Sequence, residues 1–428
     1  MSTISDKLPP RSSQVVLFQR ARSQWYRLFQ AALNSLAIAS LVIGVRWLGL
    51  LQPLELYAYD RLMQLRPGEV KPDPRILVVT VDNSDIKYQE QAGMKYKSSL
   101  ESLSDPALNK LLDELEKLNP TSIGLDIYRP AGFDSDLSIR LQKDERFFAI
   151  CKAYSVENNK NYFGTPPPQD IPKQQWGFSD VLLDRDRVVR RHLLSMIPKP
   201  TDPCDTDYSL SSLLALHYLS EKKDITAKLT SEGEWQLKNL ILKRLNNHNS
   251  GYQKLDDRGY QILLNYRFYS SPKTVANSIS LQKVLKDGIP PPLLKRMQQP
   301  IVLIGTIARG ENYDDFFDTP YGKEIPGVFL QAQMVSQIIS AVLDERPMLW
   351  WWSDLGEALW IWGWSIVGGI LVLTSAHRLY LAFNVTGSLI GIFAISLVIF
   401  IHGEWIPLIP PVLALVTTTI IVSKTLHL

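Results

Sequence analysis

The chain has 428 residues, of which 45% are hydrophobic and 21% are charged, and its formal net charge is +3 at pH 7. This composition excludes an intrinsically disordered chain, because such chains combine low hydrophobicity with a high net charge. The apolar residues cluster in long uncharged windows, which argues against a simple cytosolic enzyme. Residues 52–350 have nearly balanced charges, so we expect no nucleic acid among the partners.

The first uncharged window predicts a transmembrane helix over residues 28–51. Residues 1–27 are basic and predict a cytoplasmic tail, because positive residues favour the inner side of a membrane. The small residues 37–39 lie in the middle of the apolar run, so we expect an uncleaved anchor and not a secretory signal. Arg46 lies near the outer end, where its long stem reaches the interface; the alternative is a buried charge on an ion path.

The next region alternates strand-like and helix-like stretches. The β-branched run over residues 75–81 predicts a strand that is buried on both faces. A helix is predicted after it, with Ser104 or Asp105 as its N-cap and leucines at helical spacing up to Leu118. A second strand is predicted over residues 121–128. The order strand, helix, strand favours a parallel pair with a right-handed crossover.

The pattern continues to the end of this region, with further elements predicted near residues 188–197, 210–219, 262–266, 300–307 and from Pro326 onward. The window 325–343 is also uncharged, but its glutamines and serines are costly in lipid. Its apolar residues fall largely on one helical face, which favours an amphipathic helix of a soluble domain. Residues 52–350 therefore predict an α/β domain of one or two lobes.

Three more uncharged windows predict transmembrane helices, and a short tail follows them, over residues 355–376, 379–401, 405–423 and 424–428. Four crossings return the C-terminus to the cytoplasm. Arg378 and Lys424 then face the cytoplasm and Glu404 faces outward, as the distribution of positive residues favours. We expect an integral protein of a bacterial inner (plasma) membrane, with residues 52–350 in the periplasmic or extracellular space.

The chain has two cysteines, Cys151 and Cys204, and both lie in the predicted α/β domain. Two cysteines are too few for a disulfide-stapled scaffold, and this domain is long enough to bury a core without one. If the domain lies outside the cytoplasm, the two residues can form one disulfide bond. Two unpaired buried thiols are an equally good interpretation.

Polar residues that follow the predicted strands are the candidates for a binding site, because ligands of open α/β sheets sit beyond the carboxyl ends of the strands. The candidate ligand-binding residues are Asp82, Asp85, Asp126, Arg129, Asn265, Arg267, Thr306 and Asp315. Asp315 belongs to an acidic group with Asp314 and Asp318. The alternative is structural: Asp82 and Asp126 would then cap loops and satisfy buried backbone groups.

Catalytic constellations are absent from the sequence. The three histidines of the region, His192, His217 and His248, lack the spacing of metal ligands, and no GxSxG, HExxH or GxxxxGK motif occurs. We therefore expect no catalysis and no cofactor. The enzyme alternative would use Asp82, Asp126 and Asp315 with a divalent ion outside the membrane.

A set of short blocks in the middle region, taken together and in this order, resembles the CHASE type-2 domain, the cyclase/histidine-kinase-associated sensory extracellular domain. The blocks are 54–61, 74–82, 123–128, 177–180, 186–191, 301–306, 315–320 and 325–333. One span before the domain and three after it also match the usual arrangement of that family. The resemblance implies an α/β sensory domain outside the membrane that receives an unidentified small-molecule or protein signal.

The resemblance also implies how the signal is used. Family domains are usually joined to a cytoplasmic cyclase, kinase or phosphodiesterase, and the receptors often work as dimers. Because only residues 423–428 follow the last predicted span, we expect output through a separate cytoplasmic or membrane partner. The expected function is a membrane sensor module; the alternatives are the metal-dependent enzyme and a membrane-anchored assembly or interaction protein.

Overall fold

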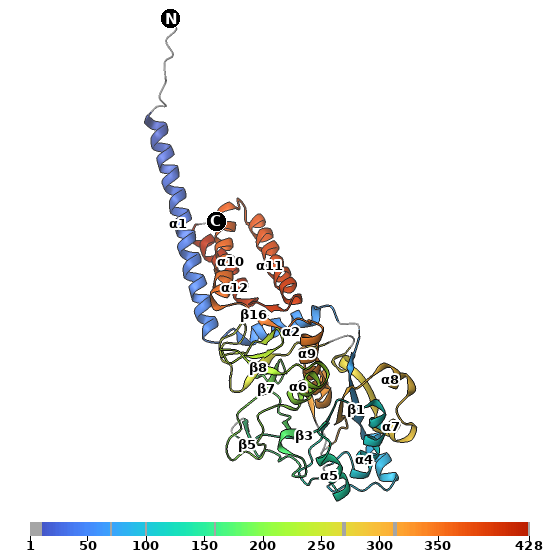
Figure 1. Cartoon of the computed structure of the whole chain (residues 1–428). Coiled ribbons are helices and arrows are strands. Elements are labelled where there is room, and N and C mark those ends of the chain that lie inside the picture. The colour runs from blue at the N-terminus through green and yellow to red at the C-terminus, as the bar shows by residue number, and fades with distance from the viewer. Residues whose placement is uncertain are drawn as a thin grey trace. The chain divides into compact units, whose positions relative to one another are not determined.

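The structure is a computed structural model that describes residues 11–426 apart from 69–70, 99–100, 158–159, 268–270 and 311–314, so Asp314 lies outside the described residues (Figure 1). The chain forms two compact units. The helical unit comprises residues up to 65, 247–255 and 351 onward, and the α/β unit comprises 66–246 and 256–350. Residues 52–65 and 247–255, which we had placed in the α/β domain, thus fold with the apolar helices.

The α/β unit is built on a parallel sheet of six strands in the order β12-β1-β13-β2-β3-β6. In chain order these strands are β1 (Asp73–Val81), β2 (Ser122–Asp126), β3 (Phe147–Cys151), β6 (Trp176–Phe178), β12 (Ala276–Ser280) and β13 (Ile301–Thr306). The central strands are buried on both faces, as the continuous β-branched runs predict. All six carboxyl ends therefore lie at one edge of the sheet.

Helices cover both faces of this sheet. On one face lie α3 (Asn83–Gln91), α4 (Asp105–Leu115), α5 (Ser135–Gln142), α7 (Leu281–Asp287) and α8 (Pro291–Arg296). On the other face lie α6 (Leu210–Lys223) and α9 (Gly327–Leu343) (Figure 1). Alternate residues of β1 divide between the two cores: Leu77 and Val79 face the first group, and Ile76 and Val78 face the second. The unit is thus a three-layer α/β sandwich.

The structure contains the helix and the two strands predicted at the start of this region, but the two strands do not pair with each other. Ser104 is the N-cap of α4, since its side chain accepts a hydrogen bond from the Ala107 N–H, and α4 runs on into the short 3₁₀ helix η1 (Glu116–Leu118). Strands β1 and β2 are parallel, but they are not neighbours. Strand β13, from far along the sequence, lies between them and pairs with both.

Smaller elements complete the α/β unit. Two antiparallel pairs are β7 (Arg191–Ser195) with β11 (Tyr260–Leu263) and β14 (Phe316–Asp318) with β15 (Glu324–Pro326). The other short elements are β4 (Ser155–Glu157), β5 (Lys160–Tyr162), η2 (Lys173–Gln175), β8 (Ala227–Leu229), β9 (Trp235–Leu237), β10 (Leu240–Leu242) and η3 (Pro272–Val275). Cys151 at the end of β3 forms a disulfide bond with Cys204.

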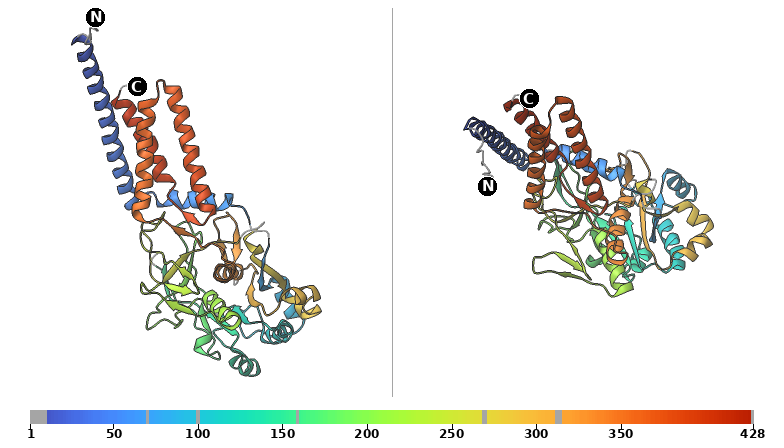
Figure 2. Two further views of the ribbon diagram at one scale, coloured as in Figure 1. Left: turned by 45° about the horizontal axis from the view of Figure 1, so that its top comes forward. Right: turned by 90° about the horizontal axis from the view of Figure 1, so that it is seen from above.

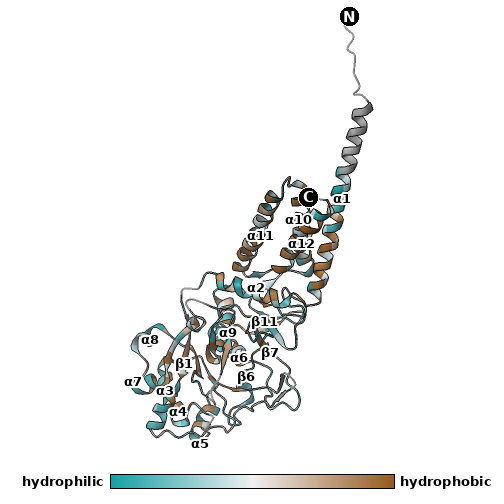
Figure 3. Cartoon of the chain, turned by 180° about the vertical axis from the view of Figure 1, so that it is seen from behind, coloured by the Kyte–Doolittle hydropathy of each residue, from teal (hydrophilic) through white to brown (hydrophobic). Residues whose placement is uncertain are grey.

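The helical unit contains four long helices that run side by side, with α2 (Gln52–Leu65) lying across one end of them (Figure 2). The four are α1 (Arg11–Trp47), α10 (Asp354–Thr374), α11 (Arg378–Ile401) and α12 (Ile409–Thr425). Hydrophobic residues dominate α10, α11 and α12 (Figure 3). The segment 24–47 of α1 and the helices α10 and α11 are long and apolar enough to cross a membrane. Helix α12 is apolar but shorter, with 17 residues.

Helix α12 begins four residues later than the expected span. The expected start was Trp405, but Glu404–Trp405 forms the short strand β17, as Trp350–Trp351 forms β16 before α10. The carboxylate of Glu55 accepts a hydrogen bond from the Ile409 N–H at 2.6 Å and a longer one from the Leu408 N–H. A carboxylate at the first turn stabilises a helix N-terminus, so Glu55 fixes the place where α12 starts.

Arg46 does not extend to an interface, and that expectation is wrong. Its side chain is buried, forms an ion pair with Glu357 in the first turn of α10, and donates a hydrogen bond to the Ser250 carbonyl at 2.7 Å. Both partners belong to the helical unit. Arg46 turns inward because a buried charge is stabilised by a paired carboxylate and a carbonyl oxygen.

Candidate functional site

A cavity of about 1900 Å³ opens at the carboxyl edge of the parallel sheet, on the side covered by α6 and α9. Its walls include Asp126 and Thr306, which end the adjacent strands β2 and β13, and Asp315 and Gln331. The chain leaves β13 toward α9 on one face, whereas it leaves β2 toward α5 on the other face. Such a reversal at the carboxyl ends of neighbouring strands is where open α/β sheets bind ligands.

Asp126 is the buried acid of this cavity. It is the last residue of β2, opposite Gly305 of β13, and only 8% of it is exposed. Among the residues that the structure describes, no side chain or backbone group makes a hydrogen bond to its carboxylate. Burial, together with the nearby Asp315 carboxylate, raises the pKa of Asp126 well above its usual range. A buried acid in this state needs either a proton or a bound cation.

Asp315 directly precedes β14, lies beside the N-terminus of α9 and is close enough to Asp126 to raise its pKa. Its backbone carbonyl accepts a hydrogen bond from the Gly327 N–H at 2.9 Å. A Cβ atom on Gly327 would overlap the Asp315 carboxylate, so only glycine leaves room for the acid at this helix N-terminus. The partial positive charge at the beginning of α9 favours an anion in this position.

Helix α9 also places Gln331 in the cavity wall, one turn after Gly327. Gln331 is only 3% exposed, and in the described part of the chain its Oε1 atom has no hydrogen-bond donor. A buried amide oxygen without a partner costs about 1 to 3 kcal/mol of desolvation. The cavity therefore contains an acceptor that the fold itself does not satisfy.

The cavity is also lined by hydroxyl groups and by a third acid, Asp180. The Tyr128 hydroxyl lies 2.6 Å from the Ser179 Oγ atom, and the Asp180 carboxylate accepts a hydrogen bond from the Ala153 N–H at 2.9 Å. Burial raises the pKa of Asp180 to about 6. Burial also raises the pKa of the Tyr128 phenol, and the charges of Asp180, Asp126 and Asp315 add to this effect. Tyr128 therefore keeps its proton beside the acids.

The structure brings three of the predicted site residues together, namely Asp126, Thr306 and Asp315, and it places the other five elsewhere. The Thr306 hydroxyl also contacts the Val81 carbonyl at 3.3 Å, which ties the ends of β13 and β1 together. The role of these three residues in ligand binding stays a prediction.

Asp82 and Asp85 form the start of α3. The Asp82 carboxylate accepts hydrogen bonds from the Ser84 and Asp85 N–H groups, and the Asp85 carboxylate accepts one from the Asp82 N–H, which is a capping box. Asp85 also accepts a hydrogen bond from the Gln282 N–H at 2.6 Å, and burial raises its pKa to about 6. The structural alternative that we gave for Asp82 thus describes its observed contacts.

Arg129 is not among the residues that line the cavity, and it lies in a buried ion cluster at the start of α4. It forms ion pairs with Asp105 and Glu101 and donates a hydrogen bond to the Leu103 carbonyl at 2.5 Å. Arg129 and Asp105 are both buried, so the pair joins the loop after β2 to the N-terminus of α4. This arrangement holds the edge of the sheet in place and makes Arg129 a positioning residue.

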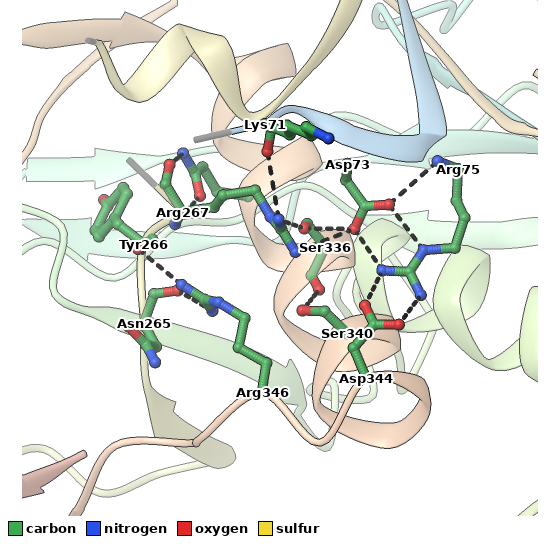
Figure 4. Close-up of polar contacts among 11 residues, drawn as sticks. Lys71, Asp73, Arg75, Asn265, Tyr266, Arg267, Ser336, Ser340, Asp344 and Arg346 are labelled. Atoms are coloured by element: carbon green, nitrogen blue, oxygen red, sulfur yellow. Dashed lines mark hydrogen bonds and ion pairs between the residues drawn. The ribbon is translucent and has the colours of Figure 1, made fainter. Parts of the chain in front are cut away.

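Asn265 and Arg267 lie at the opposite, amino edge of the sheet, in the polar cluster of Figure 4. Asn265 accepts a hydrogen bond from Arg66 and donates one to the Pro347 carbonyl. Arg267 donates to Ser336 on α9 at 3.1 Å and pairs with Asp73. The preceding strand, β11, is antiparallel and belongs to a separate two-stranded sheet, so the rule for parallel strand ends does not apply to it.

The reasoning from strand ends missed Gln331, Gly327, Tyr128 and Asp180. Gln331 had a signal, because a glutamine in an otherwise apolar helix must find a polar environment or remain unsatisfied. We used the glutamines only as evidence against a membrane span. Within the described residues, no group of three or more histidine, cysteine, aspartate or glutamate side chains is arranged to hold a metal ion.

The comparisons with known proteins agree with this architecture. The family model of the CHASE2 domain matches residues 37–370, which is most of the chain. No curated protein and no solved structure matches the chain. CHASE2 domains are sensory extracellular domains and are not catalytic, so the enzyme alternative falls away. Together with the apolar helices, the match indicates a membrane protein with a sensory role. The chain belongs to the CHASE2 domain family.

Proposed function

We propose that this protein is an integral membrane sensor whose α/β unit binds a small molecule outside the cytoplasm, in the cavity lined by Asp126. One observation carries the proposal: a buried acid with no hydrogen-bond partner among the described residues faces a large cavity at the carboxyl edge of a parallel sheet. A fold has no structural use for such a group, whereas a binding site does. Membership of a sensory family supports the same conclusion.

The proposed location is the bacterial plasma membrane, with four crossings and both termini in the cytoplasm. The distribution of charged residues supports this orientation, since Arg378 and Lys424 lie on the proposed inner side and Glu404 on the outer side. Helix α12 has 17 residues and is therefore roughly 26 Å long, close to the thickness of the hydrocarbon core.

A ligand transmits a signal only if it binds two arrangements of the protein with different affinities. In the helical unit, α1, α10 and α12 form one tightly packed group: the Ser365 hydroxyl donates to the Ser35 carbonyl at 2.8 Å and lies 2.7 Å from the Thr418 hydroxyl. We propose that this group moves as one body and that a separate cytoplasmic or membrane protein, or a second copy of the chain, receives the signal.

Reporter fusions test the orientation. A reporter that is active only outside the cytoplasm should be active at Lys254 and at Glu404, and inactive at the N-terminus, at Arg378 and at the C-terminus. Activity at Arg378, or inactivity at Lys254, would contradict the proposed topology. Either result would mean that the α/β unit does not lie outside the cytoplasm, where sensing is proposed.

A thermal unfolding screen of the full chain in detergent tests the sensory cavity. A small molecule that binds only the folded state stabilises it by RT ln(1 + [L]/Kd) and therefore raises the unfolding temperature as its concentration increases. Stabilising compounds should lose their effect in a Gly327→Leu variant, because the added side chain displaces Asp315 and fills the cavity wall. A Gly363→Leu variant is the control, since a Cβ atom at Gly363 meets no heavy atom of the described chain within 4 Å. Equal responses in both variants would place binding elsewhere, and no response to any compound would favour the assembly-protein alternative.

A further inference from the structure

The chemistry of the cavity defines the class of ligand more narrowly than the family does. Three acceptor groups belong to residues that line the cavity at the carboxyl edge of the sheet: the carboxylates of Asp126 and Asp315 and the Oε1 atom of Gln331. Asp126 and Gln331 are more than nine-tenths buried, and among the described residues neither Asp126 nor Oε1 of Gln331 receives a hydrogen bond. The site therefore needs hydrogen-bond donors and positive charge.

The basic residues that line the cavity do not neutralise Asp126, because no cation among the described residues acts appreciably on its carboxylate. Arg191 pairs with Asp184 and donates to Gln261, and Arg258 pairs with Asp256. Among the residues that the structure describes, the charged neighbour that acts appreciably on Asp126 is Asp315, which carries the same sign. Two like charges in a buried site are stabilised by a cation between them.

An organic cation fits this site better than a metal ion. No three acidic, histidine or cysteine side chains among the described residues are arranged to hold a metal ion, whereas Ca²⁺ takes six to eight oxygen ligands and Mg²⁺ requires near-ideal octahedral geometry. The cavity volume of about 1900 Å³ is far larger than an ion needs. Tyr128 adds an aromatic wall beside the acids, and aromatic faces attract ammonium groups.

We propose that the cavity binds an organic ammonium ion whose N–H groups donate hydrogen bonds to Asp126, Asp315 and Gln331. An ammonium group has three donors, which matches the three acceptors. The remainder of the ligand extends along the cavity past Tyr128. This assignment rests on the proposed function, since it takes the same cavity as the sensory site.

The test uses the full chain in an uncharged detergent and measures probe binding by calorimetry and by the shift in unfolding temperature. The ammonium probes are 2-phenylethylammonium and 1,4-diaminobutane, and 2-phenylethanol is the neutral control of matched shape. Calcium and magnesium chloride probe the metal alternative. We expect the ammonium probes to bind and to raise the unfolding temperature, and 2-phenylethanol to bind at least about tenfold more weakly.

Variants locate the binding. Asp126→Asn keeps the shape of the side chain but removes its charge, and it should weaken ammonium binding by about tenfold or more. Gln331→Leu should weaken it less, because it removes one neutral acceptor. Asp256→Asn is the matched control: Asp256 lines the same cavity but is already paired with Arg258, so binding should not change. Because Asp126→Asn removes a repulsive charge, this variant should fold at least as well as the wild type.

Several outcomes would overturn the assignment: no binding of either ammonium probe, equal binding of 2-phenylethanol, stabilisation by calcium or magnesium alone, or unchanged ammonium binding in Asp126→Asn. The proposed function fails separately. If neutral or anionic compounds from the unfolding screen bind and Gly327→Leu abolishes their effect, the sensory cavity stands and only the ammonium class is wrong. If no compound of any class binds, the sensory cavity itself is refuted.

Discussion

The two edges of the parallel sheet each bury an aspartate, and the two aspartates are treated in opposite ways. At the amino edge, Asp73 accepts hydrogen bonds from Arg75 at 2.8 Å and from Ser336 at 2.8 Å, and it pairs with Arg267 (Figure 4). At the carboxyl edge, Asp126 faces Asp315 and has no such donors among the described residues. The aspartate at the amino edge thus has its hydrogen bonds supplied by the fold, whereas the aspartate at the carboxyl edge does not.

Helix α9 connects the two edges and makes the comparison direct. Gly327 and Gln331, at its beginning, line the cavity, whereas Ser336 and Ser340 lie toward its end, near Asp73 (Figure 4). The difference teaches that a buried charge by itself does not indicate function. A charge whose partners come from the fold holds the fold together, and a charge without partners indicates a binding site.

The largest effect should come from the disulfide bond that ties the end of β3, at the carboxyl edge, to the loop before α6. The bonded cysteines are 53 residues apart, so replacing both by serine should lower the free energy of unfolding by about 4 kcal/mol. The measurement is the urea midpoint at which peptides from β1 and β13 lose hydrogen-exchange protection in the full chain. A reductant should shift the midpoint of the wild type and leave that of the double variant unchanged.

The next largest effect should come from Asp73→Asn. This change leaves the partly buried guanidinium groups of Arg75 and Arg267 without their shared, fully buried carboxylate, and it should destabilise the α/β unit by about 3 kcal/mol. Asp256→Asn removes an aspartate from an exposed ion pair with Arg258 and should change stability by less than about 0.5 kcal/mol. If the same hydrogen-exchange measurement gives similar losses of stability in the two variants, the cluster around Asp73 contributes no more to stability than an exposed ion pair does.

Asp126→Asn should stabilise the α/β unit, in contrast to the two changes above. The Asp126 carboxyl is ionised in the unfolded chain at neutral pH, and burial beside Asp315 disfavours that charge, so folding must protonate the acid. Asparagine removes this cost and should raise the free energy of unfolding by about 1 to 2 kcal/mol at neutral pH. Residues of binding sites often destabilise the folded protein, so replacing such a residue increases the free energy of unfolding. If Asp126→Asn destabilises the unit as Asp73→Asn does, Asp126 has structural partners and the contrast between the edges disappears.

The stability of the α/β unit should depend on pH in opposite ways through Asp73 and through Asp126. The pairing with Arg75 holds the pKa of Asp73 below 3.8, so its stabilisation is present above about pH 4 and is lost as the pH falls through the lowered value. The pKa of Asp126 lies above 3.8, so its folded form keeps a proton and the unit loses stability as the pH rises from about 4 through the raised value. The stability gain of Asp126→Asn should therefore grow over that range. A gain that is constant with pH would contradict this assignment.

The smallest effect should come from Gln331→Leu. The Oε1 atom of Gln331 has no donor among the described residues, so its replacement by a side chain of similar size should change the free energy of unfolding by less than about 1 kcal/mol, in the stabilising direction. Gln333→Leu, on the same helix, is the control. Gln333 exchanges hydrogen bonds of 2.7 Å with the backbone of Arg267, and its loss should destabilise the unit.

Much of the fold was predictable because its signals are local. The β-branched run of β1, the leucine spacing and Ser104 cap of α4, and the long uncharged windows each depend on neighbouring residues only. The candidate site was only partly predictable. The rule of strand ends selected Asp126, Thr306 and Asp315 correctly as neighbours, but it also selected Asn265 and Arg267, because the sequence does not show that β11 lies outside the parallel sheet.

The sequence by itself determined the apolar helices, the α/β character of the middle region and the family of the chain, because hydrophobic periodicity and short motifs are written in consecutive residues. Only the tertiary structure decided that β13 separates β1 from β2 and that Arg46 pairs with Glu357. It also decided that Asp73 has partners, whereas Asp126 has no hydrogen-bond partner in the part of the chain that the structure describes. These facts depend on residues that lie far apart in the chain. Whether a buried charge is satisfied is decided by which distant side chains the fold brings within hydrogen-bond distance.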